Sequence, residues 1–147
     1  MAIQLFTIGF TQKTASEFFT LLKNNGVKKI IDIRINNKSQ LAGFAKGSDL
    51  EYFAQEILRI PYVHRIDFAP TTDLLKRYRD KKISWKQYEV EYLQLLVERD
   101  VINQIDEVLL DGAVLMCSEH LPDKCHRRLL AEYFLNRFQD ISIKHLW

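Results

Sequence analysis

The N-terminal part of the chain has the pattern of a strand, a helix and a second strand in close succession. Residues 3–8 form a short apolar run that stops at Gly9, as a buried strand does. Residues 14–25 have one apolar face, and Thr14 and Glu17 have the spacing of a capping box, which predicts a helix. Residues 29–34 are a second apolar run, which favours a strand. Two strands joined by one helix form a βαβ unit, and this unit requires a parallel sheet.

The rest of the chain continues the alternation of strands and helices. The predicted elements are a polar loop over 36–47, a helix from the capping-box spacing of Ser48 and Glu51 to about Leu58, a strand over 62–66, a helix from Asp73 with Thr72 as N-cap, a long helix capped by Ser84, a helix over 100–109, a strand leading to Cys117, a helix ending at about Phe138, and an edge strand over 141–146. We therefore expect a single α/β domain over 1–147, with a Rossmann-like three-layer fold and a mostly parallel sheet of about five strands.

The composition is that of an ordinary globular protein. With 147 residues, 47% apolar and 27% charged, the chain can bury one core. The net charge of +2 is too small to indicate nucleic-acid binding by itself. No apolar run approaches the roughly 18 residues of a membrane span, and the start lacks the pattern of a signal peptide. We expect a cytoplasmic protein with no membrane partner, in which two cysteines are reactive groups, ligands or buried thiols rather than a disulfide.

The reactive side chains gather between the last predicted strand and the last helix. Cys117 and Glu119 follow the strand, and Cys125, His126 and Arg127 come shortly after. Pro122 precedes Asp123, and this order predicts Asp123 as the N-cap of the helix. The first turn would then stabilise a thiolate at Cys125 and hold a phosphate or carboxylate, with Arg127 as a bidentate donor.

Three interpretations of this segment remain open. In the first, one cysteine is a nucleophile, and a histidine or Glu119 transfers protons. In the second, Cys117, Cys125 and His120 or His126 bind zinc, but no close second pair of ligands supports this, and we predict no metal. In the third, both cysteines pack as small apolar side chains. A phosphatase loop is excluded, because neither cysteine has an arginine six positions later.

A second group of polar residues lies at the end of the 29–34 strand. Asp32 and Arg34 are two positions apart and point to the same face. They could form a simple ion pair, or Arg34 could bind a ligand at the edge where open α/β sheets bind them. In the second case Gly9, Arg34 and Arg127 would surround an anionic group beside Cys117, Glu119, Cys125 and His126. We expect His64 to be an ordinary partly buried histidine.

A run of cations offers an alternative function. Residues 76–82 contain five Lys or Arg and one tyrosine, which is most simply a solvated helix end. A phosphate-contacting patch is the alternative, because cations and an aromatic ring suit a nucleic-acid backbone and its bases. A non-enzymatic nucleic-acid-binding module would place this run with Arg127 and Arg128 on one face.

The chain resembles an uncharacterised family called Domain of Unknown Function 488. The motifs that carry the resemblance are Thr7-Ile8-Gly9-Phe10-Thr11, Asp32-Ile33-Arg34, Cys117-Ser118-Glu119 and Cys125-His126-Arg127. The similarity extends from Thr7 to about Arg137 and implies a Rossmann-like α/β domain. Phe10 stands where the family usually has histidine, so a proton transfer by that histidine would need another group here. The resemblance implies neither a reaction nor a cofactor; the sequence leaves open an enzyme for a small anionic ligand or a nucleic-acid-binding module.

Overall fold

The structure is a computed structural model that describes residues 2–38 and 43–147. Five strands form one sheet in which every pairing is parallel, in the order β3-β2-β4-β1-β5. The strands are β1 (Ile3–Gly9), β2 (Lys29–Asp32), β3 (Tyr62–His64), β4 (Ala113–Cys117) and β5 (Ile141–Leu146). The prediction of an α/β, Rossmann-like fold is confirmed, and the sheet is wholly rather than mostly parallel.

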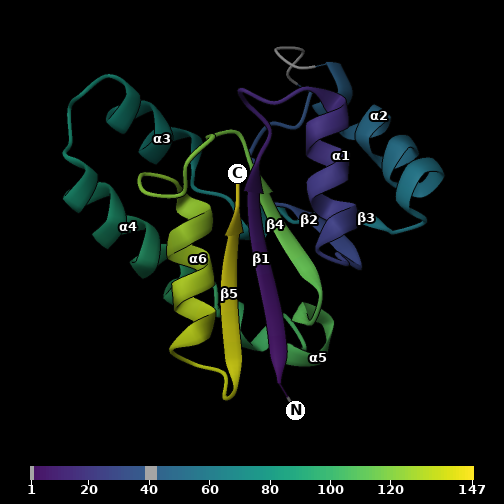
Figure 1. The fold of residues 1–147 in the computed structure, drawn as a ribbon. Coiled ribbons are helices and arrows are strands. Elements are labelled where there is room, and N and C mark those ends of the chain that lie inside the picture. The colour runs from purple at the N-terminus through teal and green to yellow at the C-terminus, as the bar shows by residue number, and fades with distance from the viewer. Residues whose placement is uncertain (1, 39–42) are drawn as a thin grey trace.

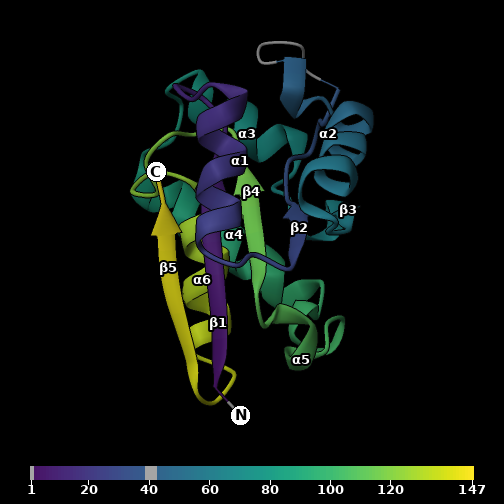
Figure 2. The same ribbon diagram turned by 45° about the vertical axis from the view of Figure 1, so that its right-hand side comes forward.

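Helices cover both faces of the sheet and make the outer two of three layers (Figure 1). One face carries α1 (Ala15–Asn24) and α2 (Gly47–Phe53), which continues into a π-helical turn (Ala54–Leu58). The other face carries α3 (Thr72–Arg79), α4 (Trp85–Glu98) and α6 (His126–Leu135). In Figure 2, α1 lies in front of the sheet and α6 lies behind it, with the short α5 (Glu107–Leu110) near the start of β4. Three 3₁₀ turns lie at Gly43–Ala45, Ile66–Phe68 and Val101–Asn103.

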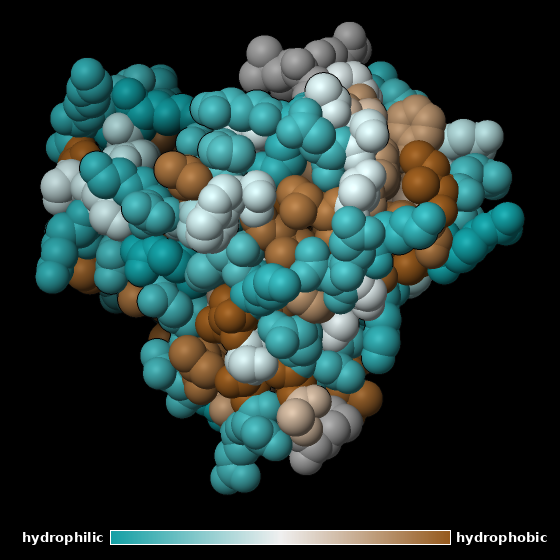
Figure 3. All heavy atoms as spheres, viewed as in Figure 1, coloured by the Kyte–Doolittle hydropathy of each residue, from teal (hydrophilic) through white to brown (hydrophobic). Residues whose placement is uncertain are grey.

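Side chains that alternate along the strands supply two separate cores. In β4, Leu115 and Cys117 face the layer of α3, α4 and α6, whereas Val114 and Met116 face α1 and α2. A strand that is buried on both faces must be apolar throughout, which explains the continuous apolar run of β4. Hydrophilic residues cover most of the face seen in Figure 3, with apolar residues exposed in small groups between them.

Several predicted helix starts are confirmed by their hydrogen bonds. Thr14 and Glu17 form the reciprocal capping box of α1, and Ser84 accepts from the backbone of Gln87 at the start of α4. Gly26, with a φ of 66°, ends the first helix as expected. The edge strand is also confirmed, since β5 pairs only with β1 in the described sheet.

Other boundaries differ from the prediction. Thr71 rather than Thr72 caps α3, and Ser48 caps nothing because α2 already begins at Gly47. The helix predicted over 100–109 is a 3₁₀ turn followed by α5, and the strand predicted over 62–66 ends at His64. The predicted loop over 36–47 includes residues 39–42, which lie outside the described part.

The start of the last helix is the correction that matters most for function. The predicted N-cap Asp123 is wrong, because α6 begins at His126 and its N-cap position is Cys125. Cys125 has extended backbone angles and makes no side-chain capping bond. The segment before it is a turn closed by a bond from the Cys125 N–H to the carbonyl of Pro122. Cys125 therefore lies just before the first helical turn, which starts with His126 and Arg127.

The topology brings the polar ends of three strands together. β4 lies between β2 and β1, with Gly9 paired to Cys117 and Asp32 paired to Met116. The chain leaves β1 toward α1 on one face and leaves β4 toward α6 on the other face. Adjacent strands whose connections diverge in this way open a crevice at their carboxyl ends, where α/β proteins bind ligands. No helix in the described part of the chain is both long and apolar enough to cross a bilayer.

Candidate active site

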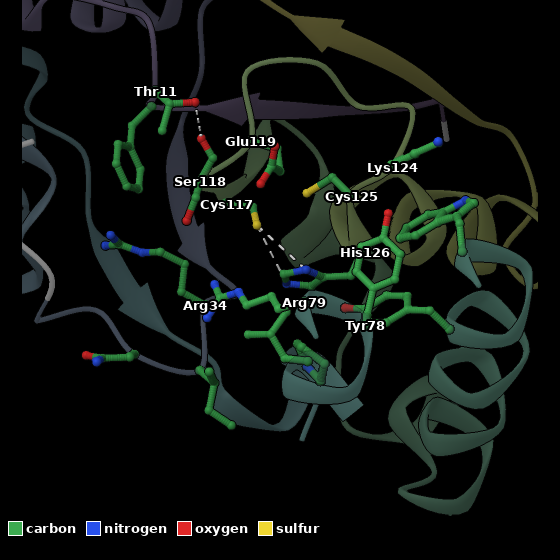
Figure 4. Close-up of a pocket in the computed structure, with 17 residues that line it drawn as sticks. Thr11, Arg34, Tyr78, Arg79, Cys117, Ser118, Glu119, Lys124, Cys125 and His126 are labelled. Atoms are coloured by element: carbon green, nitrogen blue, oxygen red, sulfur yellow. Dashed lines mark hydrogen bonds between the residues drawn. The ribbon is translucent and has the colours of Figure 1, made fainter. Parts of the chain in front are cut away.

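A cavity of about 360 Å³ lies at the carboxyl edge of the sheet (Figure 4). This volume is within the range of roughly 300–1,000 Å³ that is usual for small-molecule sites. The ends of β1, β2 and β4, the first residues of α6 and the helices α3 and α4 all contribute to its wall. The lining residues are Phe10, Thr11, Arg34, Ile35, Asn36, Pro70, Leu75, Tyr78, Arg79, Trp85, Tyr88, Cys117, Ser118, Glu119, Lys124, Cys125 and His126.

Cys117 and His126 form a hydrogen-bonded pair in this wall. The sulfur of Cys117 is 3.6 Å from Nδ1 of His126, and both residues are buried. Nε2 of the same ring is 2.8 Å from the carbonyl oxygen of Ile33. Since a carbonyl can only accept, the proton of the neutral ring is on Nε2, and the lone pair of Nδ1 faces Cys117. The ring is thus held by a third group in the tautomer that can take a proton from the thiol.

The surroundings of Cys117 favour its thiolate. A hydrogen bond from Cys125 lowers the pKa of Cys117, and the charge of Arg127 and the backbone N–H groups of Ser118 and Glu119 act in the same direction. Burial opposes this effect, but the pKa remains below the ordinary value of a thiol. The nearest groups on α4, Tyr88 and Tyr92, have pKa values raised by burial and stay neutral.

The pKa of Cys125 shifts in the opposite direction, and the surroundings of this residue do not favour the predicted thiolate. Burial raises the pKa of Cys125 well above its usual value, and the neighbouring Cys117 raises it further. Cys125 is only 3% exposed and makes no bond to the free N–H groups of α6. These surroundings favour the neutral thiol at Cys125, which donates a hydrogen bond to the sulfur of Cys117. Opposite pKa shifts at two neighbouring titratable groups are typical of sites in which one group acts in its charged form and the other in its neutral form.

Arg34 is both an ion-pair partner and a part of the cavity wall. Its Nε and Nη2 donate to the two carboxylate oxygens of Asp32 at 2.9 and 2.8 Å, and Nη2 also donates to the carbonyl of Ala45. Although burial acts to lower it, the pKa of Arg34 is raised by the bonds and charge of Asp32. The guanidinium lies 5.0 Å from the ring of Phe10. Among the residues that the structure describes, its Nη1 is the one buried side-chain nitrogen or oxygen without a hydrogen-bond partner.

Arg127 and Gly9 do not line the cavity. Arg127 is fully buried, and its guanidinium donates to the carbonyls of Glu119 and His120 and to the hydroxyl of Thr7. Gly9 lies against the same turn, since a Cβ added there would be 1.5 Å from the carbonyl oxygen of Glu119. These two residues support the segment after Cys117 from behind. Of the three predicted anion-binding residues, the structure therefore brings only Arg34 to the cavity.

The structure brings all four predicted catalytic residues to the cavity. Cys117, Glu119, Cys125 and His126 all line the cavity, with Glu119 more exposed than the other three. Their catalytic roles stay predictions. His64, which donates from Nε2 to the carbonyl of Arg34 at 2.6 Å, is a partly buried structural histidine at the next strand end, as expected.

Two kinds of cavity residue were not predicted from the sequence. Arg79 and Lys124 are exposed cations in the wall, and Tyr78, Trp85 and Tyr88 form an aromatic wall from α3 and α4. Arg79 belongs to the cationic run at 76–82, but the run gave no reason to place it near Cys117. The helical spacing of Trp85 and Tyr88 correctly indicated packing, and it carried no signal that one side of the rings borders a cavity.

The cluster at Cys117 also has the donor set of a metal site. Single ligand atoms of Cys117, Cys125 and His126 lie within 4.8 Å of one another, and all three residues are buried. Two sulfurs and one imidazole nitrogen suit zinc, with a fourth position left open. The zinc interpretation named Cys117 and Cys125 with either His120 or His126, and the structure brings His126 to the two sulfurs. These residues fit a zinc ion, but the prediction of no metal is untested.

The cations expected of a nucleic-acid interface do not form one continuous face. Arg127 is fully buried, and Arg128 makes ion pairs with Glu89 and Glu132. Within the run at 76–82, Arg77 pairs with Asp73 and Glu91. The nucleic-acid alternative is therefore not favoured.

Comparison with known proteins gives one result. A family model described as Domain of unknown function DUF488 matches residues 14–134, which is most of the chain. No curated protein and no solved structure matches the chain.

Proposed function

The chain belongs to the DUF488 family, and on that premise we propose that it is an enzyme in which Cys117 is the nucleophile and the cavity binds a small anionic ligand. The observation that carries the proposal is the Cys117–His126 pair, with Nδ1 at 3.6 Å from the sulfur and the ring fixed by the carbonyl of Ile33. A nucleophile beside a base that a third group orients is the usual arrangement for covalent catalysis. The pair faces a cavity large enough for a substrate.

The proposed step is a group transfer through Cys117. Cys117 gives its proton to Nδ1 of His126, and the sulfur forms a bond to an electrophilic carbon or phosphorus atom of the ligand. The bond from that atom to the leaving group breaks, and the leaving group takes the proton from His126. Water then cleaves the bond to sulfur, which returns the group to solution as its hydroxyl product and restores the thiol. Cys125 remains a thiol throughout and donates a hydrogen bond to the Cys117 sulfur.

The charge of the wall supports an anionic ligand. Arg34, Arg79 and Lys124 are cations, and Glu119 is the one carboxylate among the lining residues. Nη1 of Arg34 is buried without a partner, so a ligand oxygen would satisfy it at no cost in protein hydrogen bonds. A phosphate or carboxylate is the group that this donor recognises best.

Phe10, which replaces the usual histidine of the family, is consistent with this arrangement. Phe10 lies beside the Arg34 guanidinium and needs no proton-transfer role, because His126 already contacts the sulfur. We further propose that residues 1–147 are one domain and that the protein works in the cytoplasm, since its two free thiols suit a reducing compartment.

Alkylation of the thiols by iodoacetamide over a range of pH tests the nucleophile. We expect one thiol of the folded protein to react, with a pH midpoint below the value of about 8.5 of an ordinary cysteine, because the thiolate persists to lower pH when the pKa is lowered. Cys117→Ser should abolish this reaction. Cys125→Ser should retain it, because a serine hydroxyl still donates to the sulfur. His126→Asn should slow it at neutral pH.

The matched serine variants also define the result that contradicts the proposal. If both thiols react only after unfolding, or if the reactive thiol is lost in Cys125→Ser and kept in Cys117→Ser, then Cys117 is not the nucleophile. Added methylphosphonate should protect Cys117, because an anion bound at Arg34 closes access to the sulfur.

A further inference from the structure

The wall of the cavity has two chemically different parts. Arg34 at the end of β2 and the backbone after Cys117 supply donors, whereas α3 and α4 supply aromatic rings. In the view of Figure 4, the sulfur of Cys117 lies between the Arg34 side chain and the ring of Tyr78. A ligand that contacts both parts would therefore occupy the cavity that Cys117 also lines.

The aromatic part is a continuous and rigid surface. The rings of Trp85 and Tyr88 are stacked at 5.0 Å with an angle of 17° between their planes. Tyr78 packs against both, at 5.5 Å from Trp85 and 5.2 Å from Tyr88. Tyr88 is buried, but Tyr78 and Trp85 remain only partly covered. The two outer rings thus keep apolar area free for a ligand.

An ion pair holds the aromatic wall in place. Two nitrogens of the Arg77 guanidinium on α3 donate to the two carboxylate oxygens of Glu91 on α4, at 3.0 and 2.7 Å. A third bond joins Arg77 to Asp73. This ion pair joins α3, which carries Tyr78, to α4, which carries Trp85 and Tyr88. A surface that is ordered before binding loses little conformational entropy when a ligand stacks on it.

We infer that the ligand is a compact anion carrying one planar aromatic ring, with its charged group at Arg34 and its ring against Tyr78 and Trp85. This assignment rests on the proposed function and names its substrate class. A cavity near the lower end of the usual range has the size for one ring and one charged group. Stacking of a ring on aromatic side chains contributes about 1–3 kcal/mol in comparable sites.

Phenylphosphonate and methylphosphonate are the probes that test the assignment, because they share the charged group and neither is hydrolysed. Titration calorimetry in buffer free of phosphate should show phenylphosphonate binding about tenfold more tightly, which corresponds to about 1.4 kcal/mol. Trp85→Leu should reduce phenylphosphonate to the affinity of methylphosphonate and leave methylphosphonate unchanged. Trp147→Leu is the matched control, because Trp147 is 61% exposed and does not line the cavity.

The results separate failure of this inference from failure of the proposed function. Equal affinity for the two probes overturns the aromatic assignment alone. The same holds if Trp85→Leu weakens the binding of both probes equally while the variant still unfolds at the wild-type temperature. Absence of binding by both probes overturns the aromatic assignment together with the anionic ligand. Loss of selective alkylation at Cys117 contradicts the nucleophile and leaves the probe comparison intact.

Discussion

Arg34 and Arg127 are both buried at the carboxyl edge of the same sheet, but their guanidinium groups have different partners. Arg127 donates to two backbone carbonyls and to Thr7, and it does not reach the cavity. Arg34 binds Asp32 through two parallel bonds, its side chain lines the cavity, and its buried Nη1 has no hydrogen-bond partner. Two buried arginines therefore differ in their bonding: every guanidinium nitrogen of Arg127 has an acceptor, whereas Arg34 has one nitrogen without a partner, which the proposed ligand would use.

The partners explain the difference. Each guanidinium nitrogen of Arg127 already donates one hydrogen bond, to Thr7, Glu119 or His120, and the charge of the group lowers the pKa of Cys117. Asp32 binds Nε and Nη2 of Arg34 and leaves Nη1 without a hydrogen-bond partner. Removing Arg127 should thus cost stability first, whereas a conservative change at Arg34 should cost ligand affinity first.

The largest loss of stability should come from Gly9→Ala, because Gly9 lies against Arg127 and the turn that Arg127 binds. The added Cβ would lie 1.5 Å from the carbonyl oxygen of Glu119 and 2.9 Å from Nη1 of Arg127. Backbone must shift to relieve such a contact, and we expect a loss of more than about 4 kcal/mol in the free energy of unfolding. Urea unfolding, or failure to obtain folded protein, measures it. Gly43→Ala is the control, since no described atom lies within 4 Å of its added Cβ; equal stability of both variants would contradict the close approach.

Arg127→Met should have the next largest effect. The variant leaves the carbonyls of Glu119 and His120 and the Thr7 hydroxyl without their donor. We expect a loss of about 3 kcal/mol, because each buried group left unsatisfied costs roughly 1–3 kcal/mol. Arg137→Met, just after the end of α6, removes an exposed arginine and should change stability by less than about 0.5 kcal/mol. If Arg127→Met unfolds like the wild type, the hydrogen bonds of Arg127 do not contribute to stability.

Arg34→Lys should have the smallest effect on stability and the clearest effect on binding. Lysine keeps the charge beside Asp32 but cannot donate in two directions from one planar group. We expect a loss of about 1–2 kcal/mol in stability and about tenfold weaker binding of methylphosphonate by calorimetry. Tyr62→Phe is the matched control, because it removes another donor to Asp32 without touching the cavity and should leave affinity unchanged. Equal affinities of Arg34→Lys and the wild type would contradict a role for Arg34 in anion binding.

Local sequence was sufficient wherever a short segment decides its own structure. The apolar runs, the capping box of Thr14 and the glycine after α1 predicted the βαβ unit correctly, because these signals act within a few residues. Because the strands are parallel, Cys117 and Arg34 lie at the same carboxyl edge of the sheet. The N-cap at Asp123 was predicted wrongly because a capping side chain is only a preference, and a turn from Pro122 to Cys125 competes with it here.

The sequence by itself determined a parallel α/β sheet and the gathering of Cys117, Glu119, Cys125 and His126 at its carboxyl edge. Only the tertiary structure decided which thiol has the lowered pKa, which ring nitrogen of His126 faces Cys117 and which arginine has a nitrogen without a partner. These properties depend on burial and on hydrogen bonds from residues far away in the chain, such as Ile33 for His126 and Thr7 for Arg127. Protonation and hydrogen bonding are decided by all the atoms around a group, and the sequence gives only the nearest of them.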